Sequence, residues 1–395
     1  GLNALGVNTT GINNIAVGAY AGDANTTGHY NVALGAFALT ANTTADANTA
    51  IGTEAMASNT TGADNVAIGK GSLGANTTAA NNTAVGTSAL AANTTGSPNI
   101  AVGKSALDAN TTGYNNIAIG QDSLGGQTTA NGNIAIGRDA LTVTTGGDNI
   151  AIGNYALDAN TTATNCIGIG YNALGVNTTG ASNVAVGNNA LDASTTGASN
   201  TGIGTGSLGA NTTGGANTAV GDAALTANTT ASNNTAVGQN ALSSMTTGYN
   251  NTAIGSQAGS GASSIGNVMV GAYAGDGSMS GNCNTVVGYY AMSANQAGHN
   301  NVAMGCSALG AQTSGNGNIA VGYYAGVELT TGGNNILLGI DAGRTGSPGG
   351  EVTTGSNEIY LGDENIGTAN IQVDWTVASD KRDKTDISPL DLGLD

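Results

Sequence analysis

The sequence has little of what ordinary globular domains are built from. Its 395 residues include one Trp, one Phe, three Pro and three Cys, and only 8 % of them are charged. One Phe and one Trp cannot supply the cores of several compact domains, which depend on large side chains. The scarcity of Pro, together with the lack of a Gly at every third position, excludes collagen. No run of eighteen apolar residues occurs, so we expect no membrane span.

Cationic and metal-binding side chains are also scarce. Seven Lys and Arg stand against 24 Asp and Glu, a formal net charge of −17, which argues against a nucleic-acid partner because phosphate backbones bind basic surfaces. Cys166, Cys283 and Cys306 form no CxxC pair, and the imidazoles are limited to His29 and His299. We therefore expect no metal site and no cofactor, and we expect the cysteines to act as small buried hydrophobic residues.

What the sequence does contain is a 17-residue repeat. A β-branched residue, a small residue, an aliphatic residue and Gly follow one another at residues 15–18, again at 32–35, and for the last time at 359–362. The Gly recurs every 17 residues, apart from two steps of 16 and a final step of 23. Such a unit is too short for a helix pair. It predicts an all-β, parallel β-solenoid (β-roll) of about twenty coils over residues 1–362, each with two short strands and two turns.

The first strand of each coil is apolar on both faces. In the first complete repeat Ile15 and Val17 point one way and Ala16 the other, and the middle column stays Ala or Gly through Ala253. Such a column suggests close approach of another backbone. Our hypothesis is that Ile and Val fill the coil while Ala packs against sister chains. The opposite assignment, with Ala inside and Ile and Val at the interface, is also open, and either one predicts a homo-oligomer.

The two turns carry repeated polar residues. An Asn precedes nearly every first strand, as at Asn14 and Asn31, and its amide can hydrogen-bond along the stack. The other turn is Asn-Thr-Thr-Gly or a near variant, as at residues 8–11. Asn-Thr-Thr also matches the N-glycosylation pattern, but it recurs because the turn recurs, so we interpret it as structural. Ice binding is disfavoured because the two Thr are adjacent rather than in two coplanar rows.

Six aromatic residues occupy the second position after the repeat Gly, and three of them cluster toward the C-terminal third, next to two further Tyr at the first position. This position is variable, which indicates solvent exposure, and exposed aromatic rings can stack on sugar rings, although scattered ones usually carry no function. The candidate receptor contacts are Tyr273, Tyr289, Tyr290, Tyr323 and Tyr324.

Beyond the repeats, residues 379–387 read Ser-Asp-Lys-Arg-Asp-Lys-Thr-Asp-Ile. They resemble the opening of the intramolecular chaperone domain at the C-terminus of phage tail fibres and tailspikes, whose signature is Ser-Asp-x-Arg-x-Lys-x-Asp-Ile. The repeats are similar to the β-rolls of tail fibres and trimeric adhesins, which are homotrimers. The resemblance implies that Ser379 and Lys384 form a self-cleaving catalytic dyad acting on the bond between Ala378 and Ser379.

The expected organisation is a solenoid shaft at 1–362, an exit strand and linker at 363–378, and the truncated start of the chaperone at 379–395. We also expect the natural protein to extend upstream of Gly1, because terminal coils of a solenoid need polar caps. A truncated chaperone puts cleavage by this chain in doubt.

Together these features predict a structural fibre that attaches to a host surface, most simply a phage tail fibre. Its expected partners are two further copies of the chain, other virion tail proteins and a host cell-surface receptor, with a glycan among the candidates. Its expected location is the virion tail or the extracellular surface. The alternative is a bacterial trimeric adhesin. A glycan-degrading tailspike is less favoured, because no coil shows the clustered pair of carboxylates that glycoside hydrolysis needs.

Overall fold

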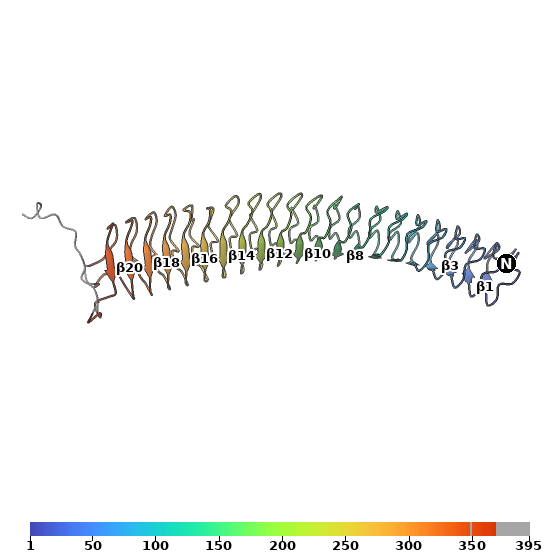
Figure 1. Cartoon of the computed structure of the whole chain (residues 1–395), viewed down its shortest axis with the longest axis horizontal. Helices are drawn as coiled ribbons and strands as arrows, with labels where there is room; N and C mark the ends of the chain where they lie inside the picture. Colours follow the sequence, from blue (N-terminus) through green and yellow to red (C-terminus); the bar gives the residue numbers. More distant parts are fainter. Residues whose placement is uncertain (348–349, 369–395) are drawn as a thin grey trace, which may run out of the picture.

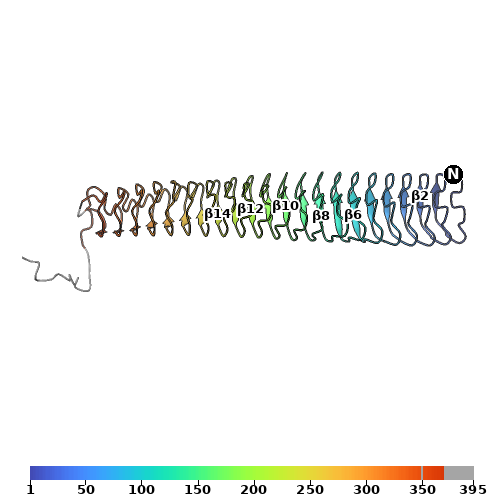
Figure 2. The same ribbon diagram turned by 90° about the horizontal axis from the view of Figure 1, so that it is seen from above.

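The computed structural model describes residues 1–347 and 350–368 as a single stack of coils that forms a long rod (Figure 1). The rod curves gently in Figure 1 and looks straight in the perpendicular view of Figure 2. All 21 strands belong to one sheet. At about 4.8 Å between neighbouring strands, the sheet is on the order of 100 Å long.

Each strand pairs in parallel with the strand one coil further along the chain. In the first pair, Ile15 lies opposite Val32 and Ala16 opposite Ala33. This register confirms the predicted parallel β-solenoid with 17-residue coils. The strands are β1 (Ile15–Val17), β2 (Val32–Leu34), β3 (Thr49–Ile51), β4 (Val66–Ile68), β5 (Thr83–Val85), β6 (Asn99–Val102), β7 (Asn116–Ile119), β8 (Ile134–Ile136), β9 (Ile150–Ile152), β10 (Ile167–Ile169), β11 (Val184–Val186), β12 (Thr201–Ile203), β13 (Thr218–Val220), β14 (Thr235–Val237), β15 (Thr252–Ile254), β16 (Val268–Val270), β17 (Thr285–Val287), β18 (Val302–Met304), β19 (Ile319–Val321), β20 (Ile336–Leu338) and β21 (Ile359–Leu361).

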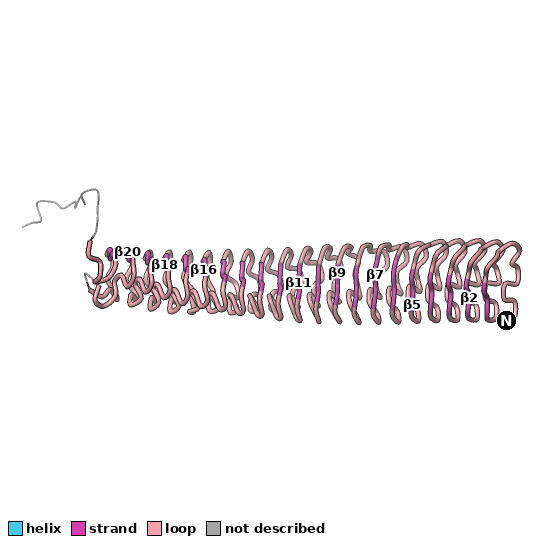
Figure 3. The backbone as a smooth tube through the Cα atoms, turned by 90° about the horizontal axis from the view of Figure 1, so that it is seen from below, coloured by secondary structure: helices cyan, strands magenta, loops and turns pink. Residues whose placement is uncertain are grey.

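The second strand predicted for each coil is wrong, because the residues after the repeat Gly form turns (Figure 3). In the coil that follows β2, Phe37 has a φ of 57° and Leu39 a φ of 54°. These left-handed conformations are incompatible with an extended strand. They also turn the chain so that the Leu39 side chain enters the coil, where it is 1 % exposed.

The interior of the coil is lined by Ala and Leu, which corrects our preferred assignment of the strand faces. The middle strand residues Ala50 and Ala67 are fully buried inside the coil, as is Leu73. The flanking residues point outward instead, and Ile100 and Val102 of β6 are 41 % and 36 % exposed. The physical reason is space: a Leu from the turn fills the narrow coil, so the facing strand position accepts only a small side chain.

Core volume is conserved between neighbouring positions. Gly replaces the buried Leu in five coils, and in four of them the middle residue of the next strand becomes large: Gly259, Gly275, Gly326 and Gly343 are followed by Met269, Val286, Leu337 and Tyr360. A Cβ atom placed on Gly326 would lie 3.4 Å from Leu337 Cδ1, so the larger strand residue occupies the space that a Leu fills elsewhere. Gly22, which faces Ala33, is the exception.

Two Asn ladders run along the rod, as the turn sequences predict, and the ladder in the opposite turn is interrupted where apolar residues such as Met245, Ala262 and Leu329 replace Asn. Before the strands, the Asn48 N–H donates to Asn31 Oδ1 at 2.9 Å, and this pattern repeats from coil to coil. In the opposite turn, Asn42 Nδ2 donates to Asn25 Oδ1 at 2.9 Å and to the Ala45 carbonyl at 3.1 Å. These bonds satisfy buried polar groups that would otherwise cost about 1–3 kcal/mol each.

Cys166 replaces one Asn of the ladder that precedes the strands. Its N–H still donates to Asn149 Oδ1 at 3.0 Å, but its thiol lies 3.2 Å from the Gly180 carbonyl where other coils place an amide. Among the described residues, the nearby Asn177 Oδ1 has no hydrogen-bond partner. The expected burial of the cysteines holds for Cys166 alone, because Cys283 is exposed and Cys306 is partly exposed.

The repeat Gly has two reasons to be invariant. Gly35 has a φ of 139°, which only Gly adopts readily. A Cβ atom at this position would also lie 2.6 Å from the carbonyl oxygen of Gly52 in the next coil. The close stacking of coils at this point therefore depends on the missing side chain.

The last coil is longer and ends the described part of the chain. Between β20 and β21 the 23-residue step holds an additional loop, and residues 363–368 form no strand. The exit strand expected within 369–378 and the segment 379–395 lie outside the described residues. The residues that are described include no helix with the length and hydrophobicity needed to cross a bilayer.

Candidate functional site

The outward side of the sheet is a continuous aliphatic and Thr-bearing face, which we call the seam face. It consists of the outward-pointing strand residues from β1 to β21, which are the first and third residue of each three-residue strand and the second and fourth residue of β6 and β7. Ile119 is 39 % exposed, Ile169 36 % and Ile254 42 %, while in β12 to β15 a Thr takes the first position. A parallel sheet normally has both faces covered, and here the coil interior covers only one.

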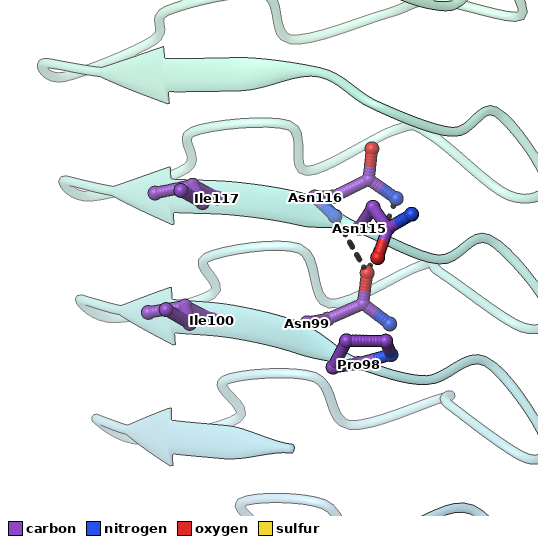
Figure 4. A pocket seen from close by; sticks show the side chains of 6 residues that line it. All are labelled: Pro98, Asn99, Ile100, Asn115, Asn116 and Ile117. Atoms are coloured by element: carbon purple, nitrogen blue, oxygen red, sulfur yellow. Dashed lines mark hydrogen bonds between the residues drawn. The ribbon is translucent and has the colours of Figure 1, made fainter. Parts of the chain in front are cut away.

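A shallow hollow of 280 Å³ lies at the edge of the seam face (Figure 4). Its lining includes Pro98 and the neighbouring side chains of Ile100 and Ile117. Below them, the N–H of Asn116 donates to Asn99 Oδ1 at 3.0 Å. The amides are thus used by the ladder, and the hollow has no titratable side chain, so it offers apolar contact and no acid–base chemistry.

The five candidate receptor tyrosines form two clusters on the turn that follows the repeat Gly. We call Tyr273, Tyr289, Tyr290, Tyr323 and Tyr324 together the tyrosine platform. In the first cluster, the rings of Tyr273 and Tyr290 stack with centroids 4.7 Å apart and planes at 9°. The ring of Tyr289 meets Tyr290 edge-on at 4.4 Å and is 52 % exposed.

The second cluster lies two coils further on. The rings of Tyr323 and Tyr324 are 4.2 Å apart at 72°, and Tyr323 is 49 % exposed. The guanidinium carbon of Arg344 lies 5.2 Å from the Tyr324 centroid, a cation–π contact that fixes this ring from its other side. The tyrosines one residue after the repeat Gly are therefore the most exposed. The tyrosines two residues after it are half-buried, and their rings support the exposed ones.

Backbone hydrogen bonds between coils hold the tyrosine platform in place. The Tyr290 N–H donates to the Ala272 carbonyl at 3.2 Å, and the Tyr324 N–H donates to the Cys306 carbonyl at 3.0 Å. Desolvation by its neighbours, with a smaller contribution from Tyr289, raises the pKa of Tyr290. A hydrogen bond with Tyr324 raises the pKa of Tyr323. The hydroxyls of Tyr290 and Tyr323 therefore stay protonated and can both donate and accept hydrogen bonds at neutral pH.

Acidic residues gather near the long final coil, where Arg344 pairs with two of them and the Thr345 hydroxyl bridges the carboxylates of Glu328 and Glu351. Arg344 Nη1 lies 3.0 Å from Asp341 Oδ1, and Arg344 Nε lies 3.9 Å from Glu328 Oε1. Glu328 also accepts from the Thr345 N–H at 2.9 Å. Within residues 1–347 and 350–368, no group of three or more His, Cys, Asp or Glu is placed to hold a metal ion.

The remaining candidate residues from the sequence divide in two groups. The amides of the Asn-Thr-Thr turns are buried in a ladder, as at Asn59, which makes them poor glycan acceptors and agrees with their interpretation as turns. Ser379 and Lys384, the candidate catalytic dyad, lie outside the described residues, and their geometry is not part of the structure.

Sequence reasoning missed which strand face is outward and how Arg344 supports the tyrosine platform. The first could have been found from the repeats themselves. Where Gly326 replaces a Leu, Ala gives way to Leu337 eleven residues later, and this exchange of size indicates that the two positions share one interior. The second could not, because Arg344 belongs to the irregular last coil, which has no counterpart elsewhere in the chain.

No known family model matches the chain, and no curated protein is similar enough to count as a match.

Proposed function

We propose that this chain is the shaft and host-attachment segment of a homotrimeric phage tail fibre, located on the virion tail. The rod shape (Figure 1) and the tail-fibre-like residues 379–387 both support this proposal. A trimer of parallel rods would bury three seam faces around one axis and leave the turns outside. Other virion tail proteins and a host-surface receptor would then be its partners.

The observation that carries the proposal is the unbroken seam face. Covering the exposed part of one Ile or Val contributes on the order of 1 kcal/mol, and such a position recurs once or twice in nearly every coil. If it had no specific partner, an apolar face of this length would promote non-specific association of the chains. Two sister chains related by rotation would cover it in register, because all three chains have the same coil spacing. The number three comes from the resemblance to tail fibres and trimeric adhesins.

The oligomer is tested by sedimentation and native mass spectrometry of the full chain. We expect the mass of three chains, and a lower melting temperature of the trimer when Lys is introduced at three consecutive outward positions of the seam face. The matched control places Lys at exposed turn positions of the same coils. The variants are I119K/I136K/I152K for the seam face and T112K/T129K/T145K for the control. A folded single chain in dilute native buffer overturns the proposal.

Attachment and processing are tested separately. Fluorescently labelled trimer should adsorb to cells of some strains in a panel of bacteria, and a uniform failure to adsorb to any of them counts against a receptor-binding role. For processing, intact-mass spectra of the chain and its Ser379→Ala variant should differ by cleavage before Ser379. Equal processing of both proteins would show that Ser379 and Lys384 do not form a catalytic dyad. An adhesin, the alternative, would instead be found anchored on the bacterial producer itself.

A further inference from the structure

Large aromatic and cationic side chains gather on one edge of the rod. Eight of the 12 Tyr, the single Phe and three of the seven Lys and Arg occupy the first or second position after a repeat Gly. The same residues also contact one another, since Tyr20 and Phe37 stack at 5.3 Å and Arg138 lies 4.9 Å above the ring of Tyr155. The opposite turn has three Tyr. This asymmetry singles out the edge after the Gly as a recognition surface.

The tyrosine platform is the densest part of this edge, and it has a gap of one coil at its centre. Tyr273 and Tyr290 stack on consecutive coils, the next coil carries the small residues Cys306 and Ser307, and Tyr324 follows on the coil after that. The Ser307 N–H donates to the Tyr289 carbonyl at 2.9 Å, so this coil is stacked as regularly as the others. The gap is therefore a space one coil wide, bordered by an aromatic ring on either side.

We propose that the tyrosine platform binds an uncharged polysaccharide that lies along the rod, with sugar rings against Tyr289 and Tyr323 and one ring above Ser307. The inference rests on the proposed attachment function and names the class of receptor. The spacing between coils is close to the length of one pyranose unit, so consecutive sugars of an extended chain meet consecutive coils. Protonated Tyr hydroxyls and the Ser307 hydroxyl supply hydrogen bonds to the sugar hydroxyls.

The negative charge of the chain favours an uncharged glycan over a polyanionic one. The chain has a formal net charge of −17, and Asp276, Asp341 and Glu328 all lie beside the tyrosine platform. Among the residues that the structure describes, the cation there is Arg344, which is already paired with Asp341 and Glu328. A polyanionic glycan would meet a field of its own sign. An uncharged chain avoids this repulsion, and the carboxylates can accept hydrogen bonds from its hydroxyls.

The experiment is affinity electrophoresis of the full chain in native gels that contain one neutral polysaccharide each (dextran, yeast mannan or hydroxyethyl cellulose) or the polyanion alginate. The platform variant is Tyr289→Ala/Tyr323→Ala. Its matched control is Tyr30→Ala/Tyr114→Ala on the opposite turn, where the rings are 60 % and 49 % exposed. Folding is preserved in the platform variant, since Ala already occupies the equivalent position at Ala36 and Ala272.

We expect at least one neutral polysaccharide to retard the unmodified chain and the control equally, with an apparent affinity at least tenfold weaker for the platform variant. Equal retardation of both variants, retardation by alginate alone, or no retardation in any neutral gel overturns the inference. Cell adsorption that is unchanged in the platform variant would leave the attachment function standing while the platform fails. Loss of adsorption in every variant, including the unmodified chain, would instead count against attachment.

Discussion

The coils from β1 to β15 and those from β16 to β21 share one backbone but differ in how the core is filled. In the first region a buried Leu from the turn meets an Ala of the strand in nearly every coil. In the second region the exchange of Leu for Gly, with a larger strand residue, occurs repeatedly. The tyrosine platform and the long final coil also belong to this region.

The difference shows that the total side-chain volume inside the coil stays the same, while the residues that supply this volume change. A Leu at the turn position must adopt a positive φ, as Leu124 does at 50°, which is unfavourable for a residue with a side chain. A Gly there relieves that strain, and the strand residue restores the lost volume. The second region therefore reaches the same coil by another combination of side chains.

The largest expected effect on stability comes from changing Leu337, whose side chain fills the space left by Gly326. Replacing Leu337 with Ala leaves a cavity beside Gly326, which should lower the free energy of unfolding by about 3 kcal/mol. Replacing Gly326 with Leu alone should overpack the same space at a cost of about 2 kcal/mol. The measurement is denaturant unfolding followed by circular dichroism.

The double variant G326L/L337A sharpens the comparison, because it rebuilds the packing of the first region within the second. We expect its stability to lie within about 1 kcal/mol of the unmodified chain, so the two single effects should be strongly non-additive. Additive losses would mean that the two positions do not share one space, and the volume argument would then be wrong.

The next effect concerns the Asn ladder, which is complete at Asn133 and interrupted at Cys166. Asn133 Oδ1 accepts from the Asn149 N–H at 3.0 Å, and its Nδ2 donates to the Gly146 carbonyl at 3.0 Å. Replacing Asn133 with Ala leaves the Asn149 N–H without its acceptor and leaves the Gly146 carbonyl with only the Thr144 hydroxyl as donor, which should cost about 2 kcal/mol. Replacing Cys166 with Asn completes the ladder and should add about 1 kcal/mol.

Thermal unfolding of both variants checks this pair of opposite changes. The control is Cys166→Ala, which removes the thiol without supplying an amide and should not stabilise the chain. Burial raises the pKa of the Cys166 thiol, so the thiol stays neutral and the comparison holds across neutral pH. A stabilised Cys166→Ala variant would show that the ladder is not the cause.

The period, the parallel stacking and the Asn ladders were predictable because each coil repeats the same local chemistry. The Gly that stacks on the Gly of the next coil and the Asn before each strand have the same partners throughout the rod. The second strand was mispredicted because alternating small and large residues such as Ala38 and Leu39 are typical of strands, while their positive φ values follow from the coil geometry. Local pattern alone does not contain that constraint.

The candidate surfaces were predictable only in part. Tyr289 and Tyr323 are exposed next to a turn position whose variability predicts exposure. The direction of the seam face was not assigned correctly, because Ala and Ile are both apolar and their alternation within one strand does not distinguish the two faces; only the exchange of size between Gly326 and Leu337 does so. Which of the two fills the coil depends on the space left by Leu73 and its equivalents, a tertiary property.

The smallest effect concerns pH and again separates the two regions. Burial raises the pKa of Asp108, Asp158 and Asp192 in the first region, whereas hydrogen bonds from Asn365 lower the pKa of Asp363 at the end of the second. A carboxyl whose pKa is raised by folding binds its proton more tightly in the folded chain. Its contribution to stability therefore falls as pH rises from about 4 towards neutrality.

For Asp363 the pH dependence has the opposite sign, because folding lowers its pKa. Its contribution to stability is therefore lost as the pH falls through that lowered pKa. Burial also raises the pKa of Asp276 in the second region, so four raised carboxyl groups against one lowered group predict a slightly higher melting temperature at pH 5 than at pH 7. Asp192→Asn should reduce this difference, since the amide cannot ionise, while the exposed control Asp222→Asn should leave it unchanged. Calorimetry at both pH values measures the difference, and a melting temperature that rises from pH 5 to pH 7 would show that the buried carboxylates of the first region do not govern its acid response.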